Sequence, residues 1–336
     1  MKEFLDKYDT VIFDLDGVIT SEQCYWDAAA LTVWEYLHSD TYIGNEKLDI
    51  APLNDTYKQI RAKVFCDDRL IYTLKGKGVN SNWDLAYITV LLSMLNGEYD
   101  FDKVLEYAEN MSDNVLDEYD LLAKRTAEKC GGKLEDYLRN GIIWKTIQNC
   151  FQEWFLGDKI YGELYGKEPI VKGKKGLVYK EKPVIEIETV RSVIKGLSQT
   201  KRLCTATGRI FSEMDKPLSE WGIKQYFSTD GLCNYDYVVK AENKLGKTLT
   251  KPHPYMFLKA LYGTDYDDEK ILNGDYDKSK IEKVLVVGDA GADILAAKAM
   301  GADFCAVLTG VSGQAARAYF EGLNAEYILN SIADFE

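Results

Sequence analysis

Two aspartates, separated by one residue, follow the first apolar segment of the chain. Residues 8–13 are rich in β-branched and aromatic side chains, and Asp14, Asp16 and Gly17 come directly after them. Because Gly17 lets the backbone leave regular strand geometry, both carboxylates can face one pocket. One carboxylate could act as a nucleophile and the other as a general acid and base. A turn that uses Asp and Gly explains this short pattern equally well.

A threonine and a glycine follow a second apolar segment, residues 201–206. The hydroxyl of Thr207 and the main-chain amide of Gly208, placed at the start of a helix, would form a seat for a phosphate group. Taken alone, Thr207 is better explained as the cap of that helix in a tight turn.

A lysine precedes two closely spaced prolines in the third segment of interest. Pro252 and Pro254 restrict the backbone ahead of a helix predicted to begin near Tyr255. Lys251 would then project from a stiff support, which suits a cation that must be fixed against an anion. A surface lysine in a proline-rich turn is the favoured interpretation when this segment is taken alone.

Two more aspartates follow the apolar run 284–287, and this fourth pattern is the most specific. Asp289 would lie at the end of a strand and Asp293 about one turn into the next helix, so both can face one pocket. Their oxygen atoms suit Mg²⁺, which takes one or two protein carboxylates and keeps several waters. The alternative is an acidic helix N-terminus without a ligand.

The elements around these residues predict an α/β fold. Beyond about residue 180, apolar strands alternate with amphipathic helices, which is typical of a parallel sheet covered by helices on both faces. Ligands bind at the carboxyl ends of the strands in such sheets, and each of the four patterns falls at the end of a predicted strand or at the start of a predicted helix. Strands are predicted at 201–206, 226–229, 283–288, 303–308 and 327–329, and helices at 186–198, 210–221, 253–262, 291–300 and 313–322.

The region between the first strand and this alternation is predicted to be mostly helical. Helical spacing of apolar residues occurs at 21–38, 53–66, 81–96, 100–129 and 142–156. The basic, glycine-rich stretch 172–176 is interpreted as a linker. Because the isolated first strand needs a partner, it is expected to pair with the later sheet. The predicted domains are therefore a core of residues 1–20 and 180–336 and an inserted helical domain of residues 21–179.

Composition limits the classes of partner. The 336 residues carry a formal net charge of −13, which disfavours binding to nucleic acid or to an anionic membrane surface. The seven cysteines are scattered singly, and no apolar run resembles a signal peptide or reaches the length of a membrane span, so a cytoplasmic protein is expected. With two histidines in the chain, a histidine-rich zinc site is disfavoured. An anionic substrate would require local devices such as a metal ion, a lysine or helix N-termini.

Taken in order, the four patterns resemble the motifs of the haloacid dehalogenase-like hydrolase superfamily. Residues 13–18 (Phe-Asp-Leu-Asp-Gly-Val) resemble its first motif, Thr207 its second, Lys251 with Pro252 its third, and residues 288–293 its fourth. The resemblance implies a Rossmann-like core, an inserted cap domain, Mg²⁺ dependence and, most often, phosphatase activity. The cap here is longer than the usual helical cap.

The resemblance also implies roles for individual residues. Asp14 would attack phosphorus and form an aspartyl-phosphate, and Asp16 would protonate the leaving oxygen and then activate water. Thr207 and Lys251 would hold the phosphoryl oxygens. The predicted metal site comprises Asp14, Asp16 through its main-chain carbonyl, Asp289 and Asp293, the last orienting a metal-bound water or Lys251. Three more residues are predicted to contact the substrate or its phosphate: Gly208, Arg209 and Glu22.

These roles predict a Mg²⁺-dependent phosphatase that acts on a small phosphorylated metabolite. A phosphomutase of the same superfamily remains an alternative, because both reactions need Asp16. A catalytically silent binding protein is disfavoured, because binding alone requires no nucleophile. The segment 75–84 is a candidate substrate contact from the cap, although an exposed loop is the favoured interpretation. The sequence predicts neither the substrate nor the oligomeric state.

Overall fold

The computed structural model describes residues 1–79, 81–97, 99–112 and 114–336. The chain divides into two compact units. The first unit combines Met1–Ser21 with Lys182–Glu336, and the second comprises Glu22–Glu181. Both ends of the chain therefore build the first unit, which contains all four motifs.

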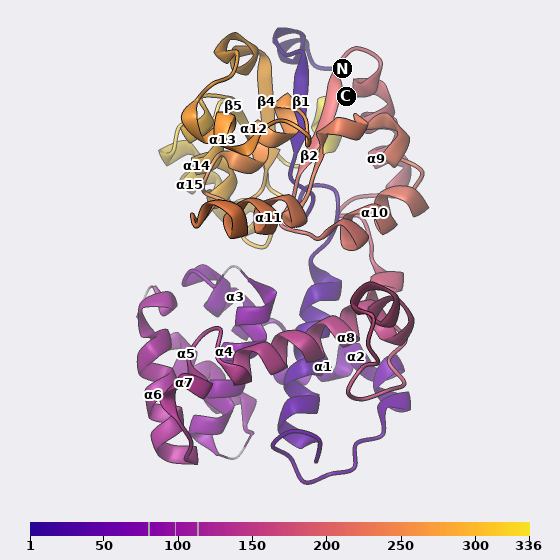
Figure 1. Ribbon diagram of the computed structural model, residues 1–336. Helices are drawn as coiled ribbons and strands as arrows, with labels where there is room; N and C mark the ends of the chain where they lie inside the picture. Colours follow the sequence, from indigo (N-terminus) through magenta and orange to yellow (C-terminus); the bar gives the residue numbers. More distant parts are fainter. Residues whose placement is uncertain (80, 98, 113) are drawn as a thin grey trace. The chain divides into compact units, whose positions relative to one another are not determined.

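A parallel sheet forms the centre of the first unit. Within the described residues it has six strands in the order β3-β2-β1-β4-β5-β6, with β1 between β2 and β4 (Figure 1). Because every pair is parallel, the carboxyl ends of the strands meet at one edge of the sheet. The strands are β1 (Thr10–Phe13), β2 (Arg202–Ala206), β3 (Leu232–Cys233), β4 (Val284–Gly288), β5 (Asp303–Val307) and β6 (Tyr327–Leu329).

Helices cover both faces of this sheet, as predicted for the α/β core. Successive strand residues point to opposite faces, so Ile12 lies in one apolar cluster and Val11 and Phe13 lie in the other. The cluster around Ile12 is closed by α11 (Tyr235–Leu245), α12 (Tyr255–Tyr262), α13 (Asp268–Asn273), α14 (Gly291–Met300) and α15 (Arg317–Gly322). The opposite cluster is closed by α9 (Ile187–Ser198) and α10 (Phe211–Glu220).

The strand predicted at 226–229 is wrong. Short 3₁₀ turns occupy Lys224–Tyr226 and Thr229–Gly231, and the strand beside β2 is Leu232–Cys233. Phe227 is buried because its ring packs against Phe13 with a centroid distance of 6.2 Å. An aromatic residue that is buried made the segment look like an apolar strand in the sequence. The backbone on either side of Phe227 forms 3₁₀ turns instead.

The second unit is mostly helical. Its helix α1 (Gln23–His38) packs against α2 (Ile50–Val64), α4 (Asn82–Asn96) and α8 (Ile142–Tyr165). The remaining helices are α3 (Arg69–Gly76), α5 (Phe101–Glu109), α6 (Tyr119–Cys130) and α7 (Leu134–Tyr137). The pattern predicted over 100–129 belongs to α5 and α6, and residue 113 within it lies outside the described residues. In the described part of the chain, every helix is too short or too polar to cross a membrane.

The stretch 172–176, interpreted from its composition as a linker, instead belongs to the second unit, where Lys174 and Gly176 are buried. The ammonium of Lys174 is fully buried between the carboxylates of Glu35, at 3.0 Å, and Glu153, at 2.6 Å. A Cβ at Gly176 would lie 2.6 Å from the carbonyl oxygen of Leu156, so the close approach of two backbones requires glycine there. Lys174 and Gly176 therefore pack against helices of the second unit, and the linker interpretation is wrong.

Candidate functional site

The ammonium of Lys251 bridges two carboxylates at the carboxyl edge of the sheet. Its Nζ lies 3.0 Å from Oδ1 of Asp14 and 2.8 Å from Oδ1 of Asp293. Asp14 directly follows β1, and its backbone N–H donates to the carbonyl oxygen of Val287 on β4, which keeps it in register with the sheet. The structure thus brings together residues from the first, third and fourth motifs.

Lys251 is held by the turn that leads into α12. The Lys251–Pro252 peptide bond is cis, and α12 begins at Tyr255, as predicted. The Nδ1 atom of His253 accepts a hydrogen bond from the backbone N–H of Tyr255 at 3.1 Å. This histidine therefore satisfies a backbone donor at the first residue of α12. Burial alone lowers the pKa of Lys251, but Asp14 and Asp293 outweigh it and raise this pKa above its ordinary value. Lys251 is therefore a permanent cation within the site.

Asp293 is fixed from two directions. One carboxylate oxygen accepts from Lys251, and the other accepts from the backbone N–H of Ala290 at 3.2 Å, which secures the first turn of α14. The side chain is 1% exposed. Asp293 therefore has a structural function at the helix start and also faces the site.

Three carboxylates of the site could hold a metal ion. Asp14, Asp289 and Asp293 each offer one oxygen atom, and these atoms lie within 4.8 Å of one another among the described residues. The three carboxylates and the ammonium of Lys251 together carry a formal charge of −2, which a divalent cation would offset. Hard oxygen ligands of this kind are those that Mg²⁺ prefers. The residues present therefore fit a magnesium ion.

The ionisation of Asp14 reflects first its burial and then the neighbouring negative charges. Burial raises the pKa of Asp14 to about 7, and the charges of Asp293 and Asp16 act in the same direction. Lys251 opposes them and lowers the pKa of Asp14. A divalent cation bound between the carboxylates would act in the same sense as Lys251 and favour the ionised form.

Two glycines make room for Asp289, and only one of them belonged to a predicted motif. A Cβ at Gly17 would lie 2.2 Å from Oδ2 of Asp289, and a Cβ at Gly310 would lie 1.9 Å from the same atom. Gly17 also has a φ of +73°, which favours glycine. Gly310 was not predicted as a site residue, although its position shortly after β5 is the same signal that identified the four motifs.

Asp16 does not join the carboxylate cluster through its side chain. Its Oδ1 accepts hydrogen bonds from Nη2 of Arg209 at 2.5 Å and from the hydroxyl of Thr20 at 3.0 Å. Arg209 was predicted to contact the substrate, but its guanidinium is 1% exposed and engaged by Asp16, so substrate binding by this residue stays a prediction. Thr20 was missed by the sequence analysis, which had no signal for it beyond its nearness to the first motif.

The second motif is placed close to Asp16 through Arg209. The hydroxyl of Thr207 is buried and accepts from the backbone N–H of Arg209 at 3.2 Å, which tightens the turn after β2. Gly208 is exposed, and α10 begins only at Phe211. The amide of Gly208 therefore lies just before the start of the helix, and its contact with phosphate stays a prediction. A role of Thr207 toward phosphate stays a prediction.

Glu22 belongs to the second unit and is engaged there by other side chains. Its Oε1 accepts from Nζ of Lys75 at 2.8 Å and from Nδ2 of Asn82 at 3.3 Å. The side chain of Lys75 is 8% exposed, so the expectation of an exposed loop is wrong for this residue. Residue 80, in the middle of the candidate segment 75–84, lies outside the described residues.

Comparisons with known proteins bear on the first unit and on the fold. The family model described as HAD-hydrolase-like matches residues 248–335, a range that contains Lys251, Asp289 and Asp293. No curated protein matches the chain. A crystal structure solved as a target of the Northeast Structural Genomics Consortium is 27% identical, with 97% of each chain covered and a TM-score of 0.82. No activity is named for that protein, so the likeness concerns the fold.

More distant structures superpose loosely. The phosphatase Tt82 from Thermococcus thioreducens is 17% identical, with 88% of this chain and 90% of that chain covered and a TM-score of 0.49. A HAD-superfamily hydrolase of subfamily IA, variant 1, from Geobacter sulfurreducens is 18% identical, with 98% of this chain and 95% of that chain covered and a TM-score of 0.42. Similarity at this level adds nothing about activity. The resemblance expected from the four motifs is confirmed by the family match and by the parallel-sheet fold.

Proposed function

We propose that this chain, a haloacid dehalogenase-like hydrolase by its motifs, family match and fold, is a Mg²⁺-dependent phosphatase. Its substrate would be a small phosphorylated metabolite, and the reaction would pass through an aspartyl-phosphate on Asp14. One observation carries the proposal: Lys251 holds the carboxylate of Asp14 at 3.0 Å beside Asp289 and Asp293. The proposed nucleophile, a cation and the proposed oxygen ligands for a divalent metal therefore come from one cluster of side chains.

In the first half of the reaction, a carboxylate oxygen of Asp14 attacks phosphorus and the bond from phosphorus to the leaving oxygen breaks. Asp16 donates a proton to that oxygen, so the product leaves as a neutral alcohol. Lys251, already fixed by two carboxylates, is close enough to Asp14 to attract a phosphoryl oxygen during attack. Thr207 would hold a further phosphoryl oxygen.

In the second half, Asp16 takes a proton from water, and the water oxygen attacks phosphorus. The bond between phosphorus and Asp14 breaks, which restores the carboxylate and releases inorganic phosphate. Mg²⁺ bound by Asp14, Asp289 and the main chain of Asp16, with Asp293 nearby, would supply positive charge that stabilises the phosphoryl group. An acidic chain with a net charge of −13 could in this way hold an anionic substrate.

The proposed partners follow from this chemistry. The substrate class is a phosphate monoester of a small metabolite, and no nucleic-acid or membrane partner is proposed. All seven cysteines are free thiols, which fits the reducing cytoplasm that we propose as the location.

The experiment is phosphate release in the presence of Mg²⁺ over a panel of sugar phosphates, nucleotides and phospho-acids. Asp14→Asn should abolish release, whereas Asp6→Asn, the same change at an exposed position of the first unit, should leave it unchanged. Retained release by Asp14→Asn would overturn the assignment. Formation of an isomeric phosphate with little free phosphate would instead indicate a phosphomutase, and a lack of turnover on every ester would indicate a binding protein.

A further inference from the structure

We propose that Arg209 is a positioning residue that, together with Thr20, orients the carboxylate of Asp16 for proton transfer. The inference rests on the proposed phosphatase function and deepens it. It gives Arg209 a function different from the direct contact with phosphate that its position after Thr207 suggested. The geometry between Arg209 and Asp16 carries it.

The guanidinium of Arg209 engages both oxygens of Asp16. Its Nε lies 3.1 Å from Oδ1 and 3.1 Å from Oδ2, and its Nη2 lies 2.5 Å from Oδ1. The hydroxyl of Thr20 adds a hydrogen bond to Oδ1 at 3.0 Å. The planar fork of an arginine fixes both the distance and the plane of a carboxylate, which a single ammonium cannot do.

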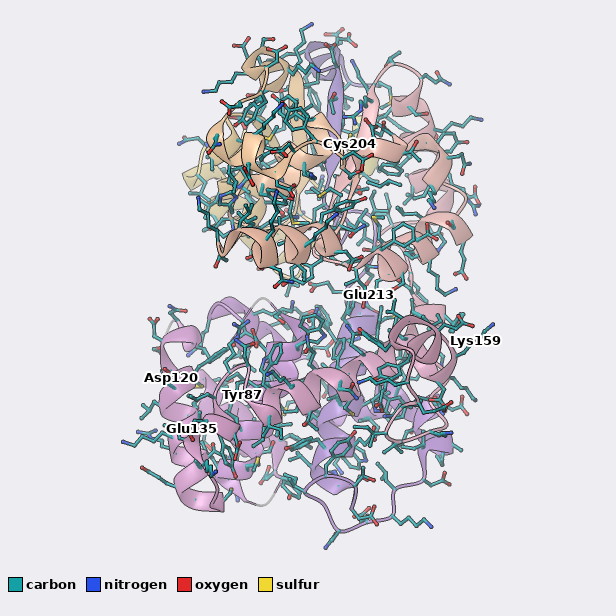
Figure 2. All side chains as sticks on the ribbon, in the orientation of Figure 1. Tyr87, Asp120, Glu135, Lys159, Cys204 and Glu213 are labelled. Carbon is teal, nitrogen blue, oxygen red and sulfur yellow. The ribbon has the colours of Figure 1, made fainter. Side chains whose placement is uncertain are left out.

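Arg209 is itself held in place. Its side chain is 1% exposed, and its Nη1 donates to the carbonyl oxygen of Glu213 at 3.1 Å. Glu213, labelled in Figure 2, belongs to α10, so the guanidinium is anchored to that helix. The backbone N–H of Arg209 donates to the hydroxyl of Thr207, which ties the same residue to the second motif. The oxygen atoms of Asp16 are therefore positioned by a rigid support.

The two carboxylate oxygens of Asp16 accept different numbers of hydrogen bonds from Arg209 and Thr20. Of the hydrogen bonds that Arg209 and Thr20 make to this carboxylate, three reach Oδ1 and one reaches Oδ2. Oδ2 therefore retains more capacity to carry a proton or to accept one from water. The proposal assigns Oδ2 as the atom that exchanges the proton with the leaving group and the attacking water.

Direct binding of the substrate phosphate by Arg209 would compete with this arrangement. To reach a phosphate, the guanidinium would have to give up a partly buried carboxylate and leave Asp16 without its main partner, which is costly. The charge of Lys251 is available beside Asp14 for the phosphoryl group. Lys251 would thus bind the phosphoryl group, whereas Arg209 would position Asp16 for proton transfer.

The test compares wild type with Arg209→Met and Arg209→Lys on p-nitrophenyl phosphate and on the best alkyl phosphate of the panel. A nitrophenolate leaving group needs no proton, whereas an alkoxide does. For the alkyl ester, kcat of Arg209→Met should fall about 10- to 100-fold with little change in KM, because a misplaced Asp16 no longer supplies acid–base catalysis. Arg209→Lys, with one point charge in place of the fork, should recover only part of kcat.

Rapid mixing with p-nitrophenyl phosphate gives a second readout. Arg209→Met should release a burst of nitrophenolate, one per active site, followed by slow steady-state release of phosphate, because only the second half of the reaction needs Asp16. A raised KM with an unchanged kcat would show that Arg209 binds phosphate and would overturn the proposal. A reduced burst amplitude with unchanged rates per active site would indicate a purely structural role and would also overturn it.

Thr20 provides a check should Arg209→Met fail to fold. Thr20→Val removes the hydroxyl with little change in shape and should show the same two changes to a smaller degree: a lower kcat on the alkyl ester, and an unchanged nitrophenolate burst followed by slowed steady-state release. Thr20→Ser keeps the hydroxyl and should recover most of the wild-type kcat. A slowed burst in Thr20→Val, or no difference between Val and Ser, would overturn the proposal. Failure of wild type to release phosphate from any ester would instead refute the proposed function.

Discussion

Lys251 and Asp293 form an ion pair of 2.8 Å in which Asp293 is almost completely buried. The same ammonium lies 3.0 Å from Asp14, so a single cation connects the proposed nucleophile to the proposed metal site. Loss of this cation should therefore damage substrate binding and nucleophile ionisation together.

Replacement of Lys251 is the first prediction. Lys251→Met should lower kcat/KM about 100- to 1,000-fold, the usual consequence of removing one fixed group that stabilises transition-state charge. It should also shift the ionisation of Asp14 to higher pH, because Lys251 lowers the pKa of Asp14. Steady-state kinetics across pH would measure both effects. Lys2→Met, at an exposed position of the same unit, is the matched control, and equal behaviour of the two variants would contradict the prediction.

The pH dependence at limiting Mg²⁺ is the second prediction. Asp14 must be ionised to attack, and burial raises its pKa to about 7, so kcat/KM should rise as pH increases through about 7. Higher Mg²⁺ should move the rise to lower pH, because the cation favours the carboxylate over the protonated acid. Rate profiles at two Mg²⁺ concentrations test this. A midpoint that does not respond to Mg²⁺ would refute the predicted coupling.

The third prediction concerns the space around Asp289. Gly310→Ala retains every metal ligand, but its new Cβ would displace Oδ2 of Asp289, which lies 1.9 Å from the position that the Cβ would occupy. Mg²⁺ affinity measured by calorimetry should fall about tenfold or more, since Mg²⁺ tolerates little displacement of an oxygen ligand. Gly322→Ala, where a Cβ meets nothing within 4 Å, should bind Mg²⁺ like wild type. An unchanged affinity in Gly310→Ala would show that Asp289 is not a ligand.

The fourth prediction concerns the stability of the helical unit. Lys174→Met leaves the buried carboxylates of Glu35 and Glu153 without their cation and should lower the free energy of unfolding by about 3–5 kcal/mol. Lys172→Met, which removes an exposed ion pair with Glu168, should cost about 0–1 kcal/mol. Thermal and denaturant unfolding followed by tryptophan fluorescence would measure both. Similar unfolding of the two variants would refute the stabilising function of Lys174.

Much of the fold and part of the site followed from local patterns in the sequence. Asp14 and Asp289 were identifiable because parallel strands place their carboxyl ends at one edge, so short motifs after different strands must converge. Asp293, one turn into the next helix, and Lys251, ahead of a helix that begins after two prolines, were identifiable from their helix starts. The buried strand β4 was equally clear from its continuous apolar run. These features depend on a few neighbouring residues and on the general geometry of parallel sheets.

Other features depend on partners that are distant in the sequence. The pairing of Arg209 with Asp16 follows from the packing of two separate loops, and nothing in either segment indicates it. Composition made the segment around Lys174 look like a linker, because its partners Glu35 and Glu153 lie in remote helices. Gly310 lies shortly after a strand, as the motif aspartates do, but the close approach of Asp289 that requires a glycine there appears only in three dimensions.

The central claim is that Asp14 accepts the phosphoryl group. The most direct measurement is peptide mass spectrometry of Asp16→Asn protein that has been acid-quenched during reaction with p-nitrophenyl phosphate and Mg²⁺. Because this variant cannot activate water, the peptide that contains Asp14 should carry one phosphoryl group, and the group should be missing in the Asp14→Asn, Asp16→Asn double variant. Nitrophenolate release without phosphorylation of that peptide, or phosphorylation that persists in the double variant, would contradict the account.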